Sequence, residues 1–341
     1  MGPACSRKDG MGSEMLGDVL RAFGIPGEVV ATDEVGRAWS NRVSSVRTTG
    51  AHVAVKELLN PWGDPHWRLW LDEAISFERK AIAAGVRAPA LLVTPSGEAV
   101  VRVAGRHFRA HEWIADAEPC PGGPVAMPIA RAVARDLATM HALRVEPTRT
   151  DIFPAPSTAT CSGWPQLVAE LRRRRSPLAA TAESVWGAVD FVRVSCDSRP
   201  ARSQRTVMSH GDVDQKNLLL SGGGPWLVDW DVAAPWASAE EALRTAMSLA
   251  DWTDPAVAGD FLSAYAAAGG DEAPPDGGLL AVDLRISIDW LDRCLRIASG
   301  LLPADPQRIA EAREQAASGL RTLTARTAIA ADLPRWLSSI D

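Results

Sequence analysis

The sequence predicts an α+β chain of two lobes, with a small antiparallel sheet and one helix in the first lobe and mainly helices in the second. Short strand-like segments are concentrated before residue 118, and long helical periodicities follow residue 239. The stretch 118–124, rich in Pro and Gly, separates them. A chain of 341 residues can fill two cores. We therefore expect a flexible tail over 1–14, a first, sheet-containing lobe over 15–118 and a second, helical lobe over 119–341.

Two early segments have features of a phosphate-binding sheet. Residues 51–56 alternate like a strand and end in Lys56, one of only four lysines in a chain whose positive charge is mostly Arg. A compact ammonium on a flexible stem suits a phosphate in a tight pocket. Just before this strand, Gly36, Ser40 and Asn41 belong to a loop whose backbone N–H groups can face phosphate. An ordinary hairpin turn is the alternative interpretation of that loop.

The next elements in order are a helix and two strands. The helix is expected from Trp67 to Gly85, which serves as its C-terminal stop, and it carries both Glu73 and Glu78. Strands are expected over 100–103 and 107–114. A further helix, 125–143, follows the breaker-rich stretch and contains His141, which we expect to be a hydrogen-bonded core residue.

The most informative part of the chain is SHGDVDQKNLLL followed by WLVDWD. Asp212 offers a carboxylate that can accept a proton from a hydroxyl, and Asn217 and Asp229 offer hard oxygen ligands for Mg²⁺. The apolar runs 218–220 and 226–228 flank the turn signal 221–225, which predicts a hairpin. Asn217 would enter this hairpin and Asp229 would leave it, so both could reach one metal ion.

The H-G-D spelling with Asn five residues on, combined with the Lys strand upstream, resembles the aminoglycoside phosphotransferase and choline kinase-like superfamily. The resemblance covers most of the chain in the right order and implies a protein-kinase-like fold that uses ATP, or GTP, with Mg²⁺. The chain departs from the family pattern at 214–216, where Asp-Gln-Lys lacks the usual Pro.

The resemblance also implies roles in catalysis. Asp212 would position the acceptor hydroxyl and take its proton, and His210 would support the loop. Asn217 and Asp229 would hold Mg²⁺, and Lys56 would grip the phosphates.

In the first lobe, the resemblance implies a carboxylate partner for Lys56 and a hinge. Glu78 is preferred as the partner for its helical phase, whereas Glu73 has the more usual separation from the lysine. The loop with Gly36, Ser40 and Asn41 would cover the nucleotide. The hinge is placed at Ala110, His111, Glu112 and Trp113, whose backbone would bind the adenine edge. Asp231 is expected to hydrogen-bond nearby backbone.

The acceptor is expected to be small and to carry a free hydroxyl, because the connection from Asp231 to residue 239 is too short for an activation segment. The net charge of −6 favours a cationic acceptor. Candidate contacts are Asp214, Asp254, Asp289 and Asp292. We therefore predict phosphorylation of an aminoglycoside-type or other amino-bearing antibiotic, in resistance or self-protection. The alternatives are a metabolite kinase for choline, a sugar or homoserine, and a nucleotide-binding pseudokinase scaffold.

Composition argues against several other classes. No run of about 18 apolar residues predicts a membrane span, and the first residues lack the apolar core of a signal peptide. The five scattered cysteines fit neither a disulfide framework nor a zinc site. We expect a cytoplasmic monomer or homodimer with no nucleic-acid partner.

Overall fold

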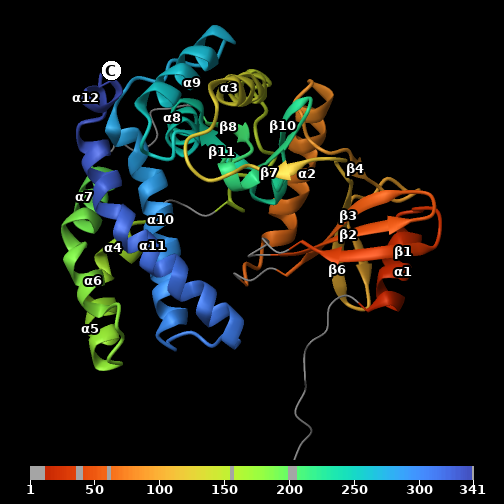
Figure 1. Cartoon of the computed structure of the whole chain (residues 1–341), viewed down its shortest axis with the longest axis horizontal. Coiled ribbons are helices and arrows are strands. Elements are labelled where there is room, and N and C mark those ends of the chain that lie inside the picture. The colour runs from red at the N-terminus through yellow and green to blue at the C-terminus, as the bar shows by residue number, and fades with distance from the viewer. Residues whose placement is uncertain (1–11, 36–40, 60–62, 154–156, 199–205, 340–341) are drawn as a thin grey trace, which may run out of the picture. The chain divides into compact units, whose positions relative to one another are not determined.

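The computed structural model describes residues 12–35, 41–59, 63–153, 157–198 and 206–339. The chain divides into two compact units (Figure 1): a first unit of residues 1–120 with 217–233, and a second unit of residues 121–216 with 234–341. The boundary expected at 118/119 lies close to the first of these divisions. The segment 217–233, expected in the second lobe, groups instead with the first. Helix α1 begins at Ser13, inside the expected tail.

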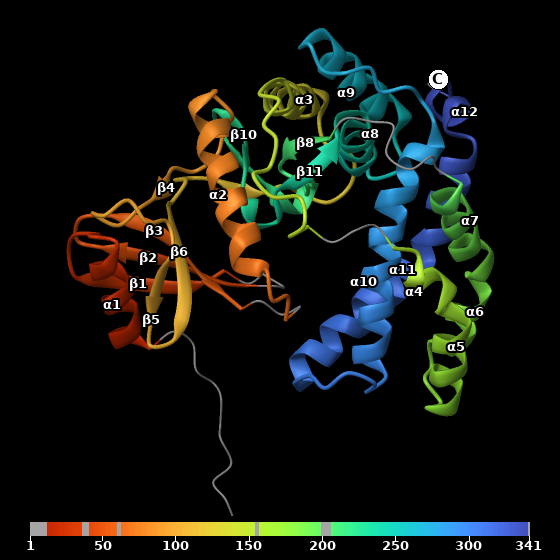
Figure 2. The ribbon, with the colours of Figure 1, turned by 180° about the vertical axis from the view of Figure 1, so that it is seen from behind.

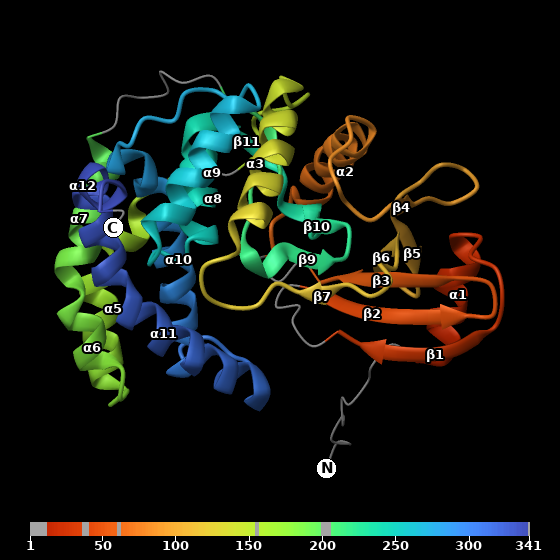
Figure 3. The same cartoon turned by 45° about the horizontal axis from the view of Figure 1, so that its top comes forward.

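The first unit is built on an antiparallel sheet with the strand order β1-β2-β3-β6-β4, and β5 also pairs with β6 (Figure 3). Its strands are β1 (Val29–Glu34), β2 (Asn41–Thr48), β3 (His52–Leu58), β4 (Leu91–Leu92), β5 (Val101–Val103) and β6 (Arg106–Glu112). Helix α1 (Ser13–Ala22) packs its apolar side chains on one face, in a core that includes Leu16, Val55 and Phe108. The predicted sheet lobe is confirmed.

Helix α2 (Trp67–Ala83) is the single long helix expected after the lysine strand. It ends two residues before Gly85, whose φ of 95° is a left-handed conformation that favours glycine. The helix buries Phe77 and Glu78, and Phe77 packs against Trp230 with ring centroids 6.2 Å apart. The indole N–H of Trp70 donates to the Ala233 carbonyl at 2.8 Å. Helix α2 is thereby fixed to the segment that follows Asp229.

The predicted hairpin is present as β9 (Leu218–Ser221) and β10 (Gly224–Leu227), and β7 (Glu118–Pro119) pairs with β9. The short 3₁₀ segments η1 (Gln215–Asn217) and η2 (Trp230–Val232) flank it. The Leu227 N–H donates to the Arg87 carbonyl at 2.8 Å, which ties the hairpin to the loop after α2. These backbone bonds explain why 217–233 belongs to the first unit.

The second unit is mainly helical, as the sequence predicts. Its one pair of strands is antiparallel, β8 (Thr206–Ser209) with β11 (Ala234–Ala237), among the residues that the structure describes. Helices α10 and α11 lie side by side, and α3 packs on α8 and α9 (Figures 1 and 2). The helices are α3 (Met127–Ala142), α4 (Ala159–Ser162), α5 (Trp164–Arg173), α6 (Ala179–Ser184), α7 (Trp186–Asp197), α8 (Ser238–Leu249), α9 (Pro255–Ala267), η3 (Gly277–Leu280), α10 (Ala281–Ala298), α11 (Pro306–Ala331) and α12 (Leu333–Leu337). In the described ranges, none of the helices combines the length and the apolar character needed to cross a bilayer.

Candidate active site

The loop of the second unit that carries Asp212 leaves β8 through two fully buried residues, Ser209 and His210. Gly211 follows with a φ of 76°, which explains why glycine suits this position. The Gly211 N–H donates to Glu241 of α8 at 2.8 Å, and the Gly211 carbonyl accepts from Arg244 of the same helix. Both backbone groups of the tight turn are therefore held by one helix.

The carboxylate of Asp212 is held by two cations. The Arg244 guanidinium donates to it at 2.7 Å, and the Lys216 ammonium lies 3.1 Å away. Burial by itself would raise the pKa of Asp212, but Lys216 and Arg244 outweigh it and hold the pKa well below its usual range. Asp212 is therefore an ionised hydrogen-bond acceptor, suited to orienting a hydroxyl. His210 contacts this loop, since its Nδ1 accepts the Asp212 N–H at 3.3 Å, and its supporting role stays a prediction.

A buried network of hydrogen bonds around His141 contacts this loop. His141 of α3 contacts Glu241 at 3.0 Å, Ser209 at 3.1 Å and the Tyr265 hydroxyl at 2.7 Å. The expectation that His141 is a hydrogen-bonded core residue is confirmed. Burial would raise the pKa of Glu241, but the hydrogen bond with His141 is the main interaction that instead lowers it.

No role was predicted from the sequence for Arg244 or Asp283, and Glu241 was considered only as one of several acids that could line an acceptor site. Arg244 also donates to Asp283 of α10 at 2.7 Å and lies over the Trp236 ring, 5.4 Å from its centroid. Glu241 and Arg244 are three residues apart on one helix, so they lie on the same face. This helical spacing is the sequence signal that could have identified them as a pair.

In the first unit, Lys56 is almost buried and lies between two carboxylates. Its ammonium is 2.6 Å from Asp229 and 2.9 Å from Asp231. Burial by itself would lower the pKa of Lys56, but Asp229 and Asp231 outweigh it and hold the pKa well above its usual value. A charged lysine is therefore placed where the predicted metal carboxylate and the predicted phosphate-binding strand meet.

Asn217 and Asp229 lie together at the base of the β9–β10 hairpin. The Val228 N–H donates to the Asn217 carbonyl at 3.0 Å, so the residue before Asp229 is opposite Asn217. Asp229 has a φ of 69°, a conformation that is costly for a non-glycine residue and concentrated at functional sites. One amide and one carboxylate form an oxygen donor set that fits Mg²⁺, which usually takes few protein ligands beside phosphates and waters. No group of three or more His, Cys, Asp or Glu side chains suited to a metal occurs within the described ranges.

Glu78 has different partners from those expected. Its carboxylate accepts from Arg109 of β6 and contacts His111 at 2.9 Å, whereas Lys56 pairs with Asp229 and Asp231. The predicted direct pair between Glu78 and Lys56 is therefore absent, and each of the two residues has other charged partners. The reason is strand register: Arg109 lies directly opposite Lys56 across the β3–β6 ladder, so its guanidinium fills the space beside Glu78. No role for Arg109 was predicted from the sequence.

Some contacts near the predicted nucleotide loop also differ from those expected. Asp231 was expected to bond backbone but instead binds three side chains, those of Lys56, Arg109 and Asn41. The Asn41 amide donates to Asp231 at 3.2 Å, and its oxygen accepts from the Leu59 N–H at 3.4 Å. Gly36 and Ser40, the other predicted phosphate contacts, lie outside the described residues.

The predicted hinge falls largely inside β6. Ala110 and His111 lie in the middle of the sheet, paired with both β3 and β4. The Glu112 N–H donates to the Ala90 carbonyl at 2.9 Å and the Trp113 N–H to the His52 carbonyl at 3.0 Å. Within the described part of the chain, the next two N–H groups, of Ile114 and Ala115, have no such partner. The backbone positions open to a ligand therefore begin after the predicted segment.

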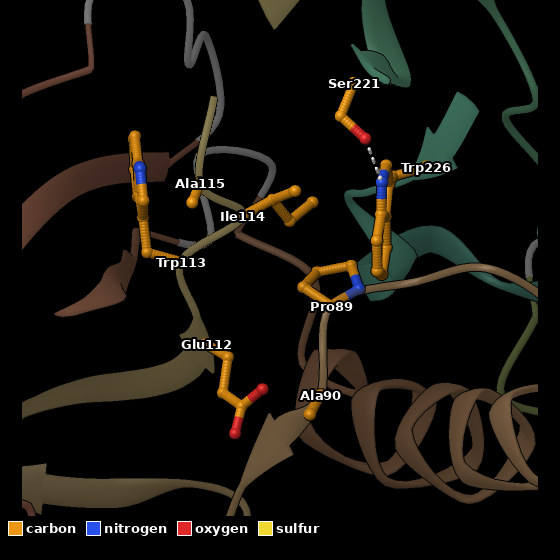
Figure 4. Close-up of a pocket in the computed structure, with 8 residues that line it drawn as sticks. All are labelled: Pro89, Ala90, Glu112, Trp113, Ile114, Ala115, Ser221 and Trp226. Atoms are coloured by element: carbon orange, nitrogen blue, oxygen red, sulfur yellow. Dashed lines mark hydrogen bonds between the residues drawn. The ribbon is translucent and has the colours of Figure 1, made fainter. Parts of the chain in front are cut away.

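A cavity of about 240 Å³ lies beside this segment (Figure 4). Its lining residues are Pro89, Ala90, Glu112, Trp113, Ile114, Ala115, Ser221 and Trp226. The Trp226 indole donates to the Ser221 hydroxyl at 2.9 Å, and the Trp113 side chain points away from Trp226 (Figure 4). The only charged group in the lining is the carboxylate of Glu112, so the cavity offers no counter-charge to a phosphate.

The four acids predicted to contact the acceptor already have local partners. Asp254 is the N-cap of α9 and accepts from Ala256 and Val257, and Asp214 accepts from the Lys216 N–H. On α10, Asp289 pairs with Arg285 at 2.6 Å and Asp292 with Arg296 at 2.7 Å. Burial raises the pKa of Asp289 above its usual range. Capping explains Asp254 fully, so it is the weakest of the four as an acceptor contact.

Comparison with known proteins gives a family and a fold. The sequence model of the phosphotransferase enzyme family (APH) matches residues 33–276. No curated protein sequence matches significantly. The structure resembles a spectinomycin phosphotransferase solved with ADP and spectinomycin (TM-score 0.71, 12% identity, 92% of this chain and 98% of that one). It also resembles an amicoumacin kinase solved with AMP-PNP, Ca²⁺ and Ami (TM-score 0.61, 10% identity, 92% of this chain and 93% of that one). A third similar structure is the choline kinase of Streptococcus pneumoniae (TM-score 0.58, 15% identity, 91% of this chain and 99% of that one).

Proposed function

The chain belongs to the phosphotransferase enzyme family (APH) and is a small-molecule kinase, and we propose that it transfers the γ-phosphate of ATP to a hydroxyl of an amino-bearing antibiotic. The observation that carries the proposal is the catalytic loop, in which Arg244 and Lys216 hold the Asp212 carboxylate in its ionised form. An ionised carboxylate at this loop position can orient a hydroxyl toward the phosphate and receive its proton.

The chemistry is an in-line displacement. The acceptor oxygen forms a bond to the γ-phosphorus, the bond from that phosphorus to the β-phosphate oxygen breaks, and ADP leaves. Because the pKa of Asp212 is low, we expect it to orient the hydroxyl early and to take the proton late, after the new bond has made that proton acidic. Asn217 and Asp229 would hold Mg²⁺, which neutralises phosphate charge when bound. Lys56 would contact the phosphate oxygens.

The nature of the acceptor is supported by charge and by resemblance. The chain carries a net charge of −6, and a cation would be attracted to it. Two of the similar structures contain amino-bearing antibiotics, spectinomycin and amicoumacin. The resemblance to a choline kinase keeps a metabolite kinase as the second candidate. A panel of antibiotics, choline, sugars and homoserine, assayed for acceptor-dependent ADP release, tests both candidates and the non-catalytic scaffold.

We expect the apparent KM of the true acceptor to rise between low and moderate ionic strength. Partly exposed charge pairs are screened over a Debye length of about 8–10 Å, so attraction of a cationic acceptor weakens with salt. The KM of Mg·ATP, measured in the same reactions, should rise less. An acceptor KM that does not depend on salt would indicate a neutral acceptor such as a sugar. Phosphorylation of a protein and of no small molecule would overturn the proposal.

We also expect ATP to be preferred over GTP. The N–H groups of Ile114 and Ala115 are donors without a partner in the described part of the chain, and adenine N1 is an acceptor whereas guanine N1 carries a hydrogen. A mismatched donor should cost on the order of tenfold in kcat/KM. The measurement is kcat/KM for ATP, GTP and 1-deaza-ATP, which lacks the ring acceptor. Equal values for ATP and 1-deaza-ATP would show that this backbone does not bind N1.

A further inference from the structure

Arg109 is a buried cation on the same face of the first unit's sheet as Lys56. It is completely inaccessible to solvent, and so is Glu78, to which it donates on one side. On its other side it donates to Asp231, which is only 11% exposed. Among the described residues its Nε has no hydrogen-bond partner, and its two terminal nitrogens donate to the two carboxylates. Arg109 thus joins helix α2 to the η2 turn.

The bridge continues on both sides. Glu78 contacts His111, and Asp231 contacts Lys56, which in turn contacts Asp229. Burial lowers the pKa of His111, although the contact with Glu78 opposes this. In this series of contacts, Arg109 connects the carboxylate of Glu78 on α2 with the carboxylates of the Asp229–Asp231 segment.

The segment that Arg109 holds needs outside support. Asp229 is in a left-handed conformation, and such conformations persist only where the surroundings over-determine them. Trp230 is buried against Phe77 of α2, and Asp231 is bound by Arg109. A phosphate at Lys56 would compete with Asp229 and Asp231 for the donors of the ammonium, whereas the contact between Arg109 and Asp231 does not involve the lysine. Arg109 can therefore hold the turn in place after the lysine has changed partners.

Resting on the function proposed above, we propose that Arg109 is the positioning residue of this site: Glu78 acts on the Asp229 turn and on Lys56 through Arg109 and Asp231, and not by a direct pair with the lysine. Removing Arg109 would leave Glu78 and Asp231 as buried carboxylates with their shared cation missing. The structural alternative is that Arg109 only stabilises the fold.

The test compares Arg109→Met and Arg109→Lys with a matched control, Arg106→Met. Arg106 lies on the same strand and also pairs with a buried carboxylate, Glu57, but it is 28% exposed and lies on the opposite face of the sheet. We measure binding of AMP-PNP by calorimetry with and without Mg²⁺, the Mg²⁺ dependence of turnover, and the melting temperature. Arg109→Met should weaken Mg²⁺-dependent AMP-PNP binding and raise the Mg²⁺ requirement by about 10–100-fold, the range seen when residues supporting metal ligands are lost. Arg106→Met should change neither.

Arg109→Lys keeps the fold charge-balanced, but one ammonium cannot reproduce the two-sided guanidinium bridge, so it should show the same defect in weaker form. A double-mutant cycle with Glu78→Gln identifies the route. Glu78→Gln should impair Mg²⁺-dependent binding in the wild type and have little further effect in Arg109→Lys.

Two results would overturn the proposal. One is an equal effect of Glu78→Gln in both backgrounds, which would mean that Glu78 acts independently of Arg109. The other is a lower melting temperature in the Arg109 variants with an unchanged Mg²⁺ dependence, which would make the role purely structural. If the wild type itself bound no AMP-PNP, the proposed function would fail along with the inference. If the wild type bound it and Arg109 variants behaved like Arg106→Met, only the inference would fail.

Discussion

We expect Asp212→Ala to lower kcat by about 10²–10⁴-fold, while the affinity for nucleotide changes little. The carboxylate orients the acceptor hydroxyl and receives its proton, and both contributions matter in the transition state more than in nucleotide binding. Asp212→Asn keeps the shape and removes the charge, so it should lose most of the same activity. Steady-state kinetics and a nucleotide-binding titration measure the two quantities separately.

A suitable control is Asp260→Ala. Asp260 is also held by an arginine in the second unit, Arg131, at 2.6 Å, but this pair lies near the surface and outside the catalytic loop. Its loss should leave kcat within about twofold, because exposed pairs contribute little. An Asp212→Ala variant with near-wild-type turnover would remove Asp212 from the mechanism.

The pH dependence follows from the same contacts. Because Lys216 and Arg244 hold the pKa of Asp212 well below its usual range, lowering the pH to about 5 should not protonate it, and kcat/KM should show no acid limb from this residue. Arg244→Met removes one cation, so the pKa of Asp212 should rise and activity should fall off at a higher pH than in the wild type. A change in maximum rate with no shift in the acid limb would assign Arg244 a different role.

The sequence predicted the elements whose signals are local. The lysine strand, the helix after it and the β9–β10 hairpin follow from alternation, helical periodicity and turn residues, and all three are present. The hairpin is also why Asn217 and the residue before Asp229 are neighbours. In each case residues close in sequence determine the structure, so pattern and spacing are sufficient.

The sequence did not predict the features that depend on strand register or on which backbone groups are already hydrogen-bonded. Both Glu78 and Lys56 were identified, but the partner of each is set by Arg109, which is opposite Lys56 only because of how β3 and β6 align. No pattern of neighbouring residues in the sequence predicts how these two strands align. The hinge at Ala110, His111, Glu112 and Trp113 stays a prediction. Whether an N–H is free depends on both neighbouring strands, and among the described residues the N–H groups without a backbone partner begin at Ile114. Backbone recognition leaves no side-chain signature.

The second large effect concerns the predicted metal ligands. We expect Asp229→Ala to lower turnover by roughly 10²-fold or more and to do so more strongly than Asn217→Ala, because it removes a charged Mg²⁺ ligand whereas Asn217→Ala removes a neutral one. Asp229→Ala also removes the closer of the two carboxylates that hold Lys56, at 2.6 Å. Asn217→Ala should recover much of its activity at high Mg²⁺, and Asp229→Ala should not.

Turnover as a function of free Mg²⁺ separates the two variants, with melting temperatures to show that both remain folded. Glu118→Ala is the matched control, since Glu118 is an exposed carboxylate on β7, the strand that pairs with β9 of the same small sheet. It should behave like the wild type at every Mg²⁺ concentration. If either Asp229→Ala or Asn217→Ala matched the wild type at limiting Mg²⁺, that residue would not be a metal ligand. Since the αL conformation of Asp229 is strained for any non-glycine residue, Asp229→Gly should relieve strain and still lose the activity, which separates the carboxylate from the backbone as the source of the effect.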